Sequence, residues 1–150
     1  MISRSNMMAK MIYRTIQWFD FNMCKHLFYK IFDMDEDKYF FKAWKNRHKT
    51  ASYIVINHGS IIGFALVDTE FCIQYLVVDP QFRGQRIGSE LMKLVCNALS
   101  DAPSIMLNTA NDPRLKLWYA KFGFEENHTY LDSNKEYLGT GMIRHQTRMM

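Results

Sequence analysis

The sequence predicts an α/β protein built around one mixed central sheet, and three observations support this fold class. Segments with helical spacing of apolar residues alternate with strand-type segments, in the order β-α-α-β-β-β-α-β-α-β-β. The chain has 150 residues, 48% of them hydrophobic, which suffices for one domain with its own core. No linker, low-complexity tract or internal repeat divides it. We therefore expect a single domain over residues 1–150, with about seven strands flanked by about four helices.

The N-terminal third predicts one strand followed by two helices. Residues 11–17 alternate roughly between apolar and polar types and carry Ile, Tyr and Thr, which favours a strand. In residues 19–32 an apolar side chain recurs at every fourth position, which is typical of a helix packed on a core. A second helix is predicted over residues 35–49, because acidic residues in its first turn and basic residues in its last turn suit the helix dipole.

Three strands are predicted next. Ala51–Asn57 and Ser60–Val67 are rich in β-branched and apolar residues, and a turn at Asn57–Ser60 joins them into a hairpin. The third strand is Phe71–Val78, whose sequence FCIQYLVV is almost continuously apolar. Such a pattern is typical of a strand that is covered on both faces, so we expect burial on both sides.

The second half predicts two helices and three strands. A helix is expected over Arg86–Leu99 and a short strand over Ile105–Asn108. Asp112 is suited to cap a helix that starts at Pro113 and ends at Phe122, with Gly123 as its C-terminal stop. Two last strands are predicted near residues 124–130 and 136–144, joined by a turn around residues 132–134.

Composition narrows the class of protein. The longest apolar run, Ile61–Val67, is far too short to span a membrane, and the N-terminus lacks the pattern of a secretory signal. The three cysteines form no CxxC pair and the five histidines have no metal-ligand spacing. We therefore expect a reduced, cytoplasmic protein with no bound metal and no membrane partner. The net charge of +4 suits a phosphate-rich ligand, but no basic stripe interleaved with aromatics predicts nucleic-acid binding.

The strongest chemical signal lies between Val77 and Met92. A predicted strand ends there, a loop with two glycines and two arginines follows, and a helix begins. The first amide groups of a helix are unpaired and, with the helix dipole, form an anion site that glycine lets a phosphate approach. Arg83 and Arg86 add positive charge, so the segment predicts a phosphorylated ligand. The alternative is an ordinary strand-to-helix turn whose glycines only satisfy backbone geometry.

The sequence VVDPQFRGQRIG, residues 77–88, resembles the acetyl-CoA-binding motif of the GNAT family of N-acetyltransferases, written Q/R-x-x-G-x-G/A. Arg83 fills the first position and Gly88 the last, whereas Arg86 replaces the usual middle glycine. The family's second signature is similar to DPRLKLWYAKFGFEE, residues 112–126. Tyr119 and the following Gly-Phe pair match that signature, and Asp112 takes the position of its usual Asn. The two matches occur in the family's order and on the expected elements.

The resemblance implies a GNAT fold in which the fourth and fifth strands splay apart and the pantetheine arm of acetyl-CoA enters between them. The backbone of Leu76, Val77 and Val78 would bond that arm. The pyrophosphate would be held by the loop and first helical turn, with Asp112 counted among the acetyl-CoA-binding residues. The loop and turn residues are Arg83, Gly84, Gln85, Arg86, Ile87, Gly88 and Ser89.

The resemblance also implies direct transfer from the thioester to an amine, without an acyl-enzyme intermediate. A main-chain N–H near Val77 or Val78 would polarise the thioester carbonyl. Tyr119 would be the general acid that protonates the departing thiolate, unless it serves only as a buried aromatic between helix and sheet. The identity of the general base that deprotonates the amine is left open, with Glu70 as the first candidate and Asp68 as the second.

Two further roles remain open at this stage. Glu70 and Asp68 are equally compatible with solvated turn residues, and Gln74 could hold a water in place of a base. Arg86 either reaches a phosphate or is a solvated residue of the first turn, and a left-handed backbone there would be costly for arginine.

The predicted function is an acetyl-CoA-dependent N-acetyltransferase that acts on a primary amine. The acceptor is a small amine or polyamine, a protein lysine or an N-terminus, and the protein is expected to be a monomer or homodimer. The alternative is a catalytically degenerate GNAT domain that acts as an acyl-CoA sensor or interaction module. A second alternative is a nucleic-acid-modifying or nucleic-acid-binding member of the fold, which the charge permits but no basic stripe interleaved with aromatics supports.

Overall fold

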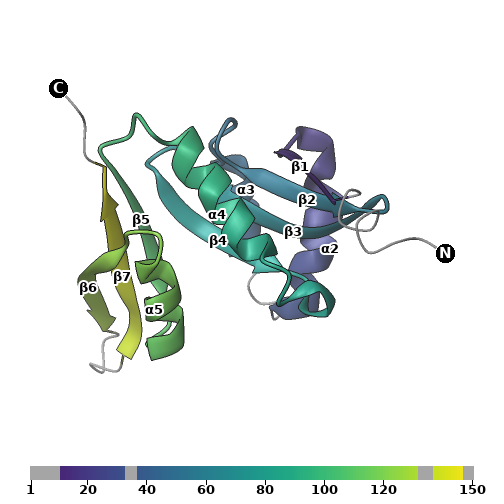
Figure 1. Cartoon of the computed structure of the whole chain (residues 1–150). Coiled ribbons are helices and arrows are strands. Elements are labelled where there is room, and N and C mark those ends of the chain that lie inside the picture. The colour runs from purple at the N-terminus through teal and green to yellow at the C-terminus, as the bar shows by residue number, and fades with distance from the viewer. Residues whose placement is uncertain (1–10, 33–36, 132–136, 147–150) are drawn as a thin grey trace.

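In a computed structural model, which describes residues 11–32, 37–131 and 137–146, the chain forms a seven-stranded sheet in the order β1-β2-β3-β4-β5-β7-β6 (Figure 1). Among these residues β4 and β5 form the parallel pair, and every other pairing is antiparallel. This arrangement confirms the predicted α/β fold with a mixed sheet. The strands are β1 (Met11–Thr15), β2 (Tyr53–Asn57), β3 (Ser60–Val67), β4 (Cys72–Val78), β5 (Ser104–Thr109), β6 (Glu125–Leu131) and β7 (Tyr137–His145).

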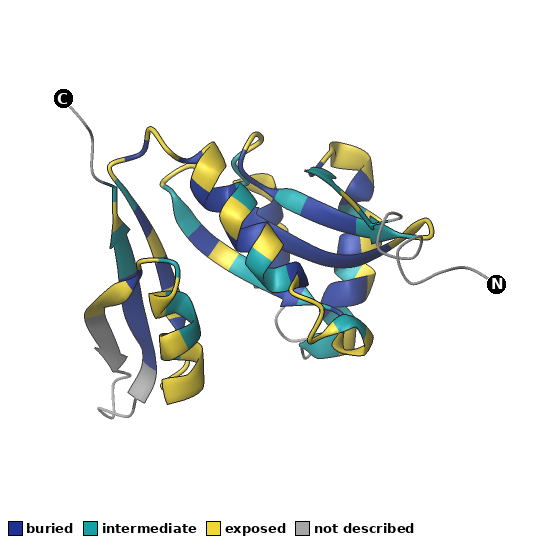
Figure 2. Cartoon of the chain, in the orientation of Figure 1, coloured by how far each residue is buried: buried dark blue, intermediate teal, exposed yellow. Residues whose placement is uncertain are grey.

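Four α-helices and two short 3₁₀ helices are described, in the predicted order. Two cores lie on opposite faces of the sheet. On one face, the helix α4 buries Leu91 and Val95 against the sheet; along this helix in Figure 2, buried and exposed positions alternate. On the other face, α2 and α3 pack an aromatic cluster in which the Phe28 and Phe40 rings are 4.7 Å apart. The helices are η1 (Trp18–Asp20), α2 (Phe21–Ile31), α3 (Asp37–Lys45), η3 (Pro80–Phe82), α4 (Ile87–Ala98) and α5 (Pro113–Ala120).

The strands β4 and β5 pair only at one end. Cys72 lies opposite Met106 and Ile73 opposite Leu107, and beyond these two pairs the strands diverge (Figure 1). The prediction that residues 71–78 are buried on both faces is therefore wrong. Gln74 is exposed and Leu76 is half-buried, and among the described residues no strand pairs with this edge of β4 past Ile73.

Two helix predictions need correction. The helix predicted over residues 35–49 ends at Lys45, because the chain then joins the end of β3: His48 N donates to the Val67 carbonyl, and Arg47 forms a β-bridge with Asp68. Its predicted start at residues 35 and 36 lies outside the described residues, as does the predicted turn at 132–134. The helix predicted over residues 19–32 is split into the turn η1 and the helix α2.

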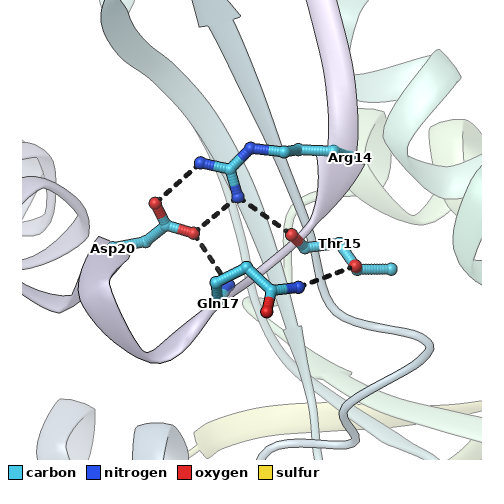
Figure 3. A network of polar contacts seen from close by, with 4 residues as sticks. All are labelled: Arg14, Thr15, Gln17 and Asp20. Carbon is cyan, nitrogen blue, oxygen red and sulfur yellow. Dashed lines mark hydrogen bonds and ion pairs between the residues drawn. The ribbon is translucent and has the colours of Figure 1, made fainter.

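A buried carboxylate accounts for that split (Figure 3). The Asp20 side chain accepts two hydrogen bonds from the Arg14 guanidinium, at 2.8 and 2.9 Å, and a third at 2.8 Å from the Gln17 N–H. Burial pushes the pKa of Asp20 upward, but the hydrogen bonds and charge of Arg14 and the Gln17 N–H outweigh it, so the pKa lies below its ordinary value. The network ties the start of α2 to the edge strand β1.

No helix in the described part of the chain is both long enough and apolar enough to cross a membrane. This finding concerns residues 11–32, 37–131 and 137–146.

Candidate functional site

A cavity of about 630 Å³ lies where the diverging end of β4 meets the start of α4 and one face of α5. Its size is typical of a site for a small ligand or coenzyme. Most of the residues predicted to bind acetyl-CoA line it, together with Tyr119. Its lining comprises Leu76, Val78, Phe82, Arg83, Gly84, Arg86, Ile87, Gly88, Ser89, Leu115, Trp118 and Tyr119.

The free edge of β4 forms one wall of this cavity. From Tyr75 to Val78 the strand pairs with β3 on one side and has no described strand partner on the other. Backbone N–H and C=O groups need hydrogen-bond partners, so an unpaired strand edge is a natural place for an extended, amide-bearing ligand. Leu76 and Val78 direct their side chains into the cavity lining.

The loop between η3 and α4 forms the second wall. Gly84 has φ of 84° and Arg86 has φ of 63°, so two left-handed residues curl the chain just before the helix begins. The helical bonding begins with Glu90 N donating to the Arg86 carbonyl, and the Arg86 side chain does not cap the helix. The amides of the first turn are therefore left for an anion, at the positive end of the helix dipole.

Arg86 occupies the backbone conformation that glycine adopts most easily. Its φ and ψ of 63° and 20° are left-handed, which costs a residue with a side chain about 1–2 kcal/mol. This left-handed conformation explains why glycine suits the middle position of the motif, and the present chain keeps the conformation although arginine occupies the position. The Arg86 side chain is exposed and lines the cavity, so it adds positive charge beside the open amides.

Aromatic side chains form the third wall. Trp118 from α5 lies against the first turn of α4, and Phe82 comes from η3. Sequence analysis assigned no site role to Phe82, Leu115 or Trp118. A signal existed for two of them, because Leu115, Trp118 and Tyr119 are three and four positions apart and so share one helix face.

Tyr119 is half-buried, with its ring edge-on to Phe124 at 6.1 Å between centroids. Burial raises the pKa of the Tyr119 hydroxyl, so the group keeps its proton at neutral pH. Within the described residues no side chain is hydrogen-bonded to this hydroxyl. Tyr119 lines the cavity, and a neutral tyrosine hydroxyl is able to donate a proton to a basic atom bound within its reach.

Four predicted residues lie outside the lining. Val77 points its side chain into the core beneath α2 and α3, and Gln85 is exposed on the loop. Asp112 caps α5 by accepting a hydrogen bond from Arg114 N at 2.9 Å. Glu70 is exposed in the turn at the opposite end of β4, where its N–H donates to Asp68.

A second cavity, of about 790 Å³, lies on the face of the sheet that carries α3. It includes residues from both β4 and β5, so the two cavities flank the opening between those strands. Within it the Gln74 amide donates to the Asp68 carboxylate at 2.9 Å. It is lined by Tyr39, Lys42, Ala43, Asn46, Asp68, Gln74, Tyr75 and Asn108.

Comparison with known proteins adds to this geometry. Residues 48–126 match the family model described as an acetyltransferase (GNAT) domain. No curated protein matches the sequence.

Several solved structures share the fold at low sequence identity. Arabidopsis thaliana Naa50 in complex with the bisubstrate analogue CoA-Ac-MVNAL superposes with a TM-score of 0.72 at 19% identity, over 90% of this chain and 98% of that one. Ard1 from Thermoplasma volcanium gives 0.76 at 17% identity, over 93% and 99%. The ribosomal-protein-S18-alanine N-acetyltransferase from Escherichia coli gives 0.73 at 15% identity, over 93% and 96%.

The family match covers more than half of the chain, including both signatures, and the described fold is that of the solved acetyltransferases. The chain therefore belongs to the GNAT family and is an acetyl-CoA-dependent acetyltransferase.

Proposed function

We propose that this protein transfers the acetyl group of acetyl-CoA, bound in the cavity between β4, α4 and α5, to a primary amine that approaches from the cavity beside α3. One observation carries the proposal: β4 and β5 separate beyond Ile73, and a cavity lies on each side of the opening. A donor and an acceptor bound on opposite faces of a sheet need such an opening to meet.

The residues of the first cavity fit the parts of acetyl-CoA. The free edge of β4 suits the amide-bearing pantetheine arm, and the open amides at the start of α4 suit the pyrophosphate. Arg83 and Arg86 line the same cavity and supply two positive charges, which phosphates favour. The aromatic wall of Trp118 and Phe82 gives an apolar surface for the remainder of the ligand.

Acetyl-CoA supplies an activated acyl group in the form of a thioester. The amine nitrogen attacks the carbonyl carbon, a C–N bond forms, and the C–S bond breaks with its electron pair on sulfur. A main-chain N–H at Val77 or Val78 polarises the carbonyl oxygen. Tyr119 donates its proton to the departing thiolate, and its raised pKa keeps that proton in place beforehand.

The amine must also lose a proton, since an alkylammonium ion has a pKa of about 10 and the α-ammonium group of a protein N-terminus one of about 8. Glu70 lines neither cavity, whereas Asp68 and Gln74 both line the second one. We assign to this hydrogen-bonded pair the holding of a water molecule, which takes the amine proton and passes a proton on to the Asp68 carboxylate. Glu70 is left as a turn residue in this mechanism.

The acceptor that we propose to test first is the α-amine of a protein N-terminus. The Naa50 structure contains an analogue in which CoA is joined to the peptide MVNAL, and another similar structure is a NatC complex bound to Gag peptide and CoA. We also propose that the protein acts in the cytoplasm as a monomer or homodimer, without a membrane or nucleic-acid partner. Its three cysteines are free, which fits a reducing compartment.

The test is calorimetric titration with acetyl-CoA, followed by a free-thiol release assay. The acceptor panel holds peptides with a free N-terminus, the same peptides N-terminally blocked with an internal lysine, and spermidine. Thiol release with the free N-termini alone supports the proposal. Release only with the blocked lysine peptides or with spermidine would show that the acceptor is a lysine or a polyamine and not an N-terminus. Binding of acetyl-CoA without any thiol release would favour the sensor alternative.

A further inference from the structure

Lys30 lies outside both family signatures and contacts Asp79, four residues before the proposed phosphate site at Arg83 to Ser89. Lys30, in the last turn of α2, donates to the Asp79 carboxylate at 2.9 Å across 49 positions of sequence. Asp79 is only 6% exposed, and its other carboxylate oxygen accepts from Gln81 N at 3.0 Å. Its own N–H donates to the Ile62 carbonyl at 2.7 Å, so the residue is fixed at the end of β4.

The Lys30–Asp79 ion pair lines a cavity that shares the residue Phe82 with the acetyl-CoA cavity. A third cavity, of about 710 Å³ on the α2 side, is lined by both Lys30 and Asp79. Phe82, three residues after Asp79, lines that cavity and also the acetyl-CoA cavity. A change at the Lys30–Asp79 pair therefore acts on the turn η3, which leads directly into the loop residue Arg83.

The charge of Asp79 is unfavourable for a neighbouring phosphate site. Its pKa lies below the ordinary value, chiefly because Lys30 donates to it, with the Gln81 N–H and the charge of Arg83 contributing. Arg83 thus lies within electrostatic reach of Asp79, yet forms no ion pair with any described residue. Without Lys30, a buried carboxylate would attract the Arg83 guanidinium and repel a bound phosphate.

We propose that Lys30 is a positioning residue for acetyl-CoA binding, which by pairing with Asp79 holds the turn η3 and leaves the Arg83 guanidinium to the phosphates. This inference rests on the proposed phosphate site at Arg83 to Ser89. Lys30 itself does not line the acetyl-CoA cavity, so it acts through Asp79 and Arg83.

The first experiment separates a phosphate effect from a general loss of structure. Lys30→Met keeps the aliphatic stem and removes the charge. We expect it to weaken acetyl-CoA binding about tenfold by calorimetry, the size of one lost charge-assisted contact. Binding of S-acetylpantetheine, which has no phosphate, should stay within about twofold by NMR titration, because its contacts with β4 are unaffected. Lys25→Met, on the same helix and away from Asp79, is the matched control and should leave both affinities unchanged.

The second experiment tests the route through the carboxylate. Asp79→Asn retains the oxygen that accepts from Gln81 N but removes the charge. If Asp79 diverts Arg83 when Lys30 is absent, adding Asp79→Asn to Lys30→Met should restore acetyl-CoA affinity to within about twofold of wild type. Lys30→Arg should retain the wild-type affinity for acetyl-CoA. The affinity of Lys30→Gln should lie between those of the wild type and Lys30→Met, so this variant can serve as the test if Lys30→Met folds poorly.

Each result decides between distinct conclusions. Equal weakening of acetyl-CoA and S-acetylpantetheine, or no recovery in the double variant, would overturn the positioning role. Unchanged acetyl-CoA affinity in Lys30→Met and Lys30→Gln would do the same while leaving the proposed function intact. If the wild-type protein binds no acetyl-CoA, the proposed function itself fails.

Discussion

The indole ring of Trp118 lies against the first turn of α4 at Gly88. A Cβ atom placed on Gly88 would be 3.5 Å from Cζ2 of Trp118 and 3.8 Å from Cγ2 of Val78, which is ordinary van der Waals contact. The two family signatures therefore meet in space, since Gly88 ends the first and Trp118 belongs to the second. There is room for one methyl group at Gly88, but a longer side chain has to turn toward the cavity.

This contact predicts different effects for two substitutions at Gly88. Gly88→Ala should fold normally and bind acetyl-CoA within about threefold of wild type, because the methyl group fits and alanine favours the helix. Gly88→Asp should weaken binding about 30-fold or more, because its carboxylate replaces an open anion site with a negative charge. Calorimetry measures both affinities, and equal weakening in the two variants would show that the first turn is not the phosphate site.

The left-handed backbone at Arg86 predicts a gain in stability on substitution by glycine. Arg86→Gly should raise the free energy of unfolding by about 0.5–1 kcal/mol, since relief of the steric cost is partly offset by the greater freedom of glycine in the unfolded chain. Denaturant unfolding measures this gain. Arg86→Ala retains the left-handed strain and should show no such increase.

The same pair of variants tests the Arg86 side chain as a ligand. Both remove the guanidinium that lines the cavity, so both should weaken acetyl-CoA binding by about fivefold if it contacts a phosphate. Undiminished affinity in both variants would leave Arg86 as a solvated residue whose only contribution is its amide N–H.

Local features of the fold could be predicted because neighbouring residues determine them. The strand Ser60–Val67 has its predicted bounds, and the hairpin turn before it contains His58 and Gly59 with positive φ. Asp112 caps α5 and Pro113 follows at the first helical position, as expected from residue types that satisfy or lack a backbone N–H. These choices depend on steric and hydrogen-bonding preferences within a few residues.

Features that depend on distant partners could not be predicted. Nothing in FCIQYLVV indicates that β5 leaves β4 after Ile73, so its apolar character suggested a strand covered on both sides. The early end of α3 depends on the bonding of Arg47 and His48 to the β3 end. For the same reason the motif located Arg83 but not Lys30, whose contact with Asp79 is made only when the chain folds.

The Arg14–Asp20 pair predicts a pH-dependent contribution to stability. Because the folded pKa of Asp20 is below its ordinary value, the contribution is complete above about pH 4 and is lost as the pH falls through the folded pKa. Asp20→Asn should lower the free energy of unfolding by about 1–3 kcal/mol at pH 7, since it leaves a partly buried arginine without its anion. The difference from wild type should shrink below about pH 4.

Unfolding curves between neutral and acid pH measure this effect. Asp112→Asn is the matched control, because asparagine caps a helix as well as aspartate does and no buried pair is lost. A difference between Asp20→Asn and wild type that stays constant with pH would show that the ionised carboxylate is not the source of the stability.

Tyr119 carries the sharpest prediction for catalysis. Tyr119→Phe keeps the ring and its contacts with Trp118 and Phe124, so the KM for acetyl-CoA should stay within about twofold of wild type. The kcat should fall by about 100-fold, because the departing thiolate loses its proton donor. Burial raises the pKa of Tyr119 above its ordinary value of about 10, so the hydroxyl keeps its proton throughout the neutral range. The kcat of the wild-type protein should therefore show no decline from ionisation of Tyr119 as the pH rises from about 7 to 9. Tyr13→Phe is the matched control, since burial also raises the pKa of Tyr13 but the residue lies on β1 outside the cavity. Equal turnover in Tyr119→Phe and wild type would assign the tyrosine a packing role only.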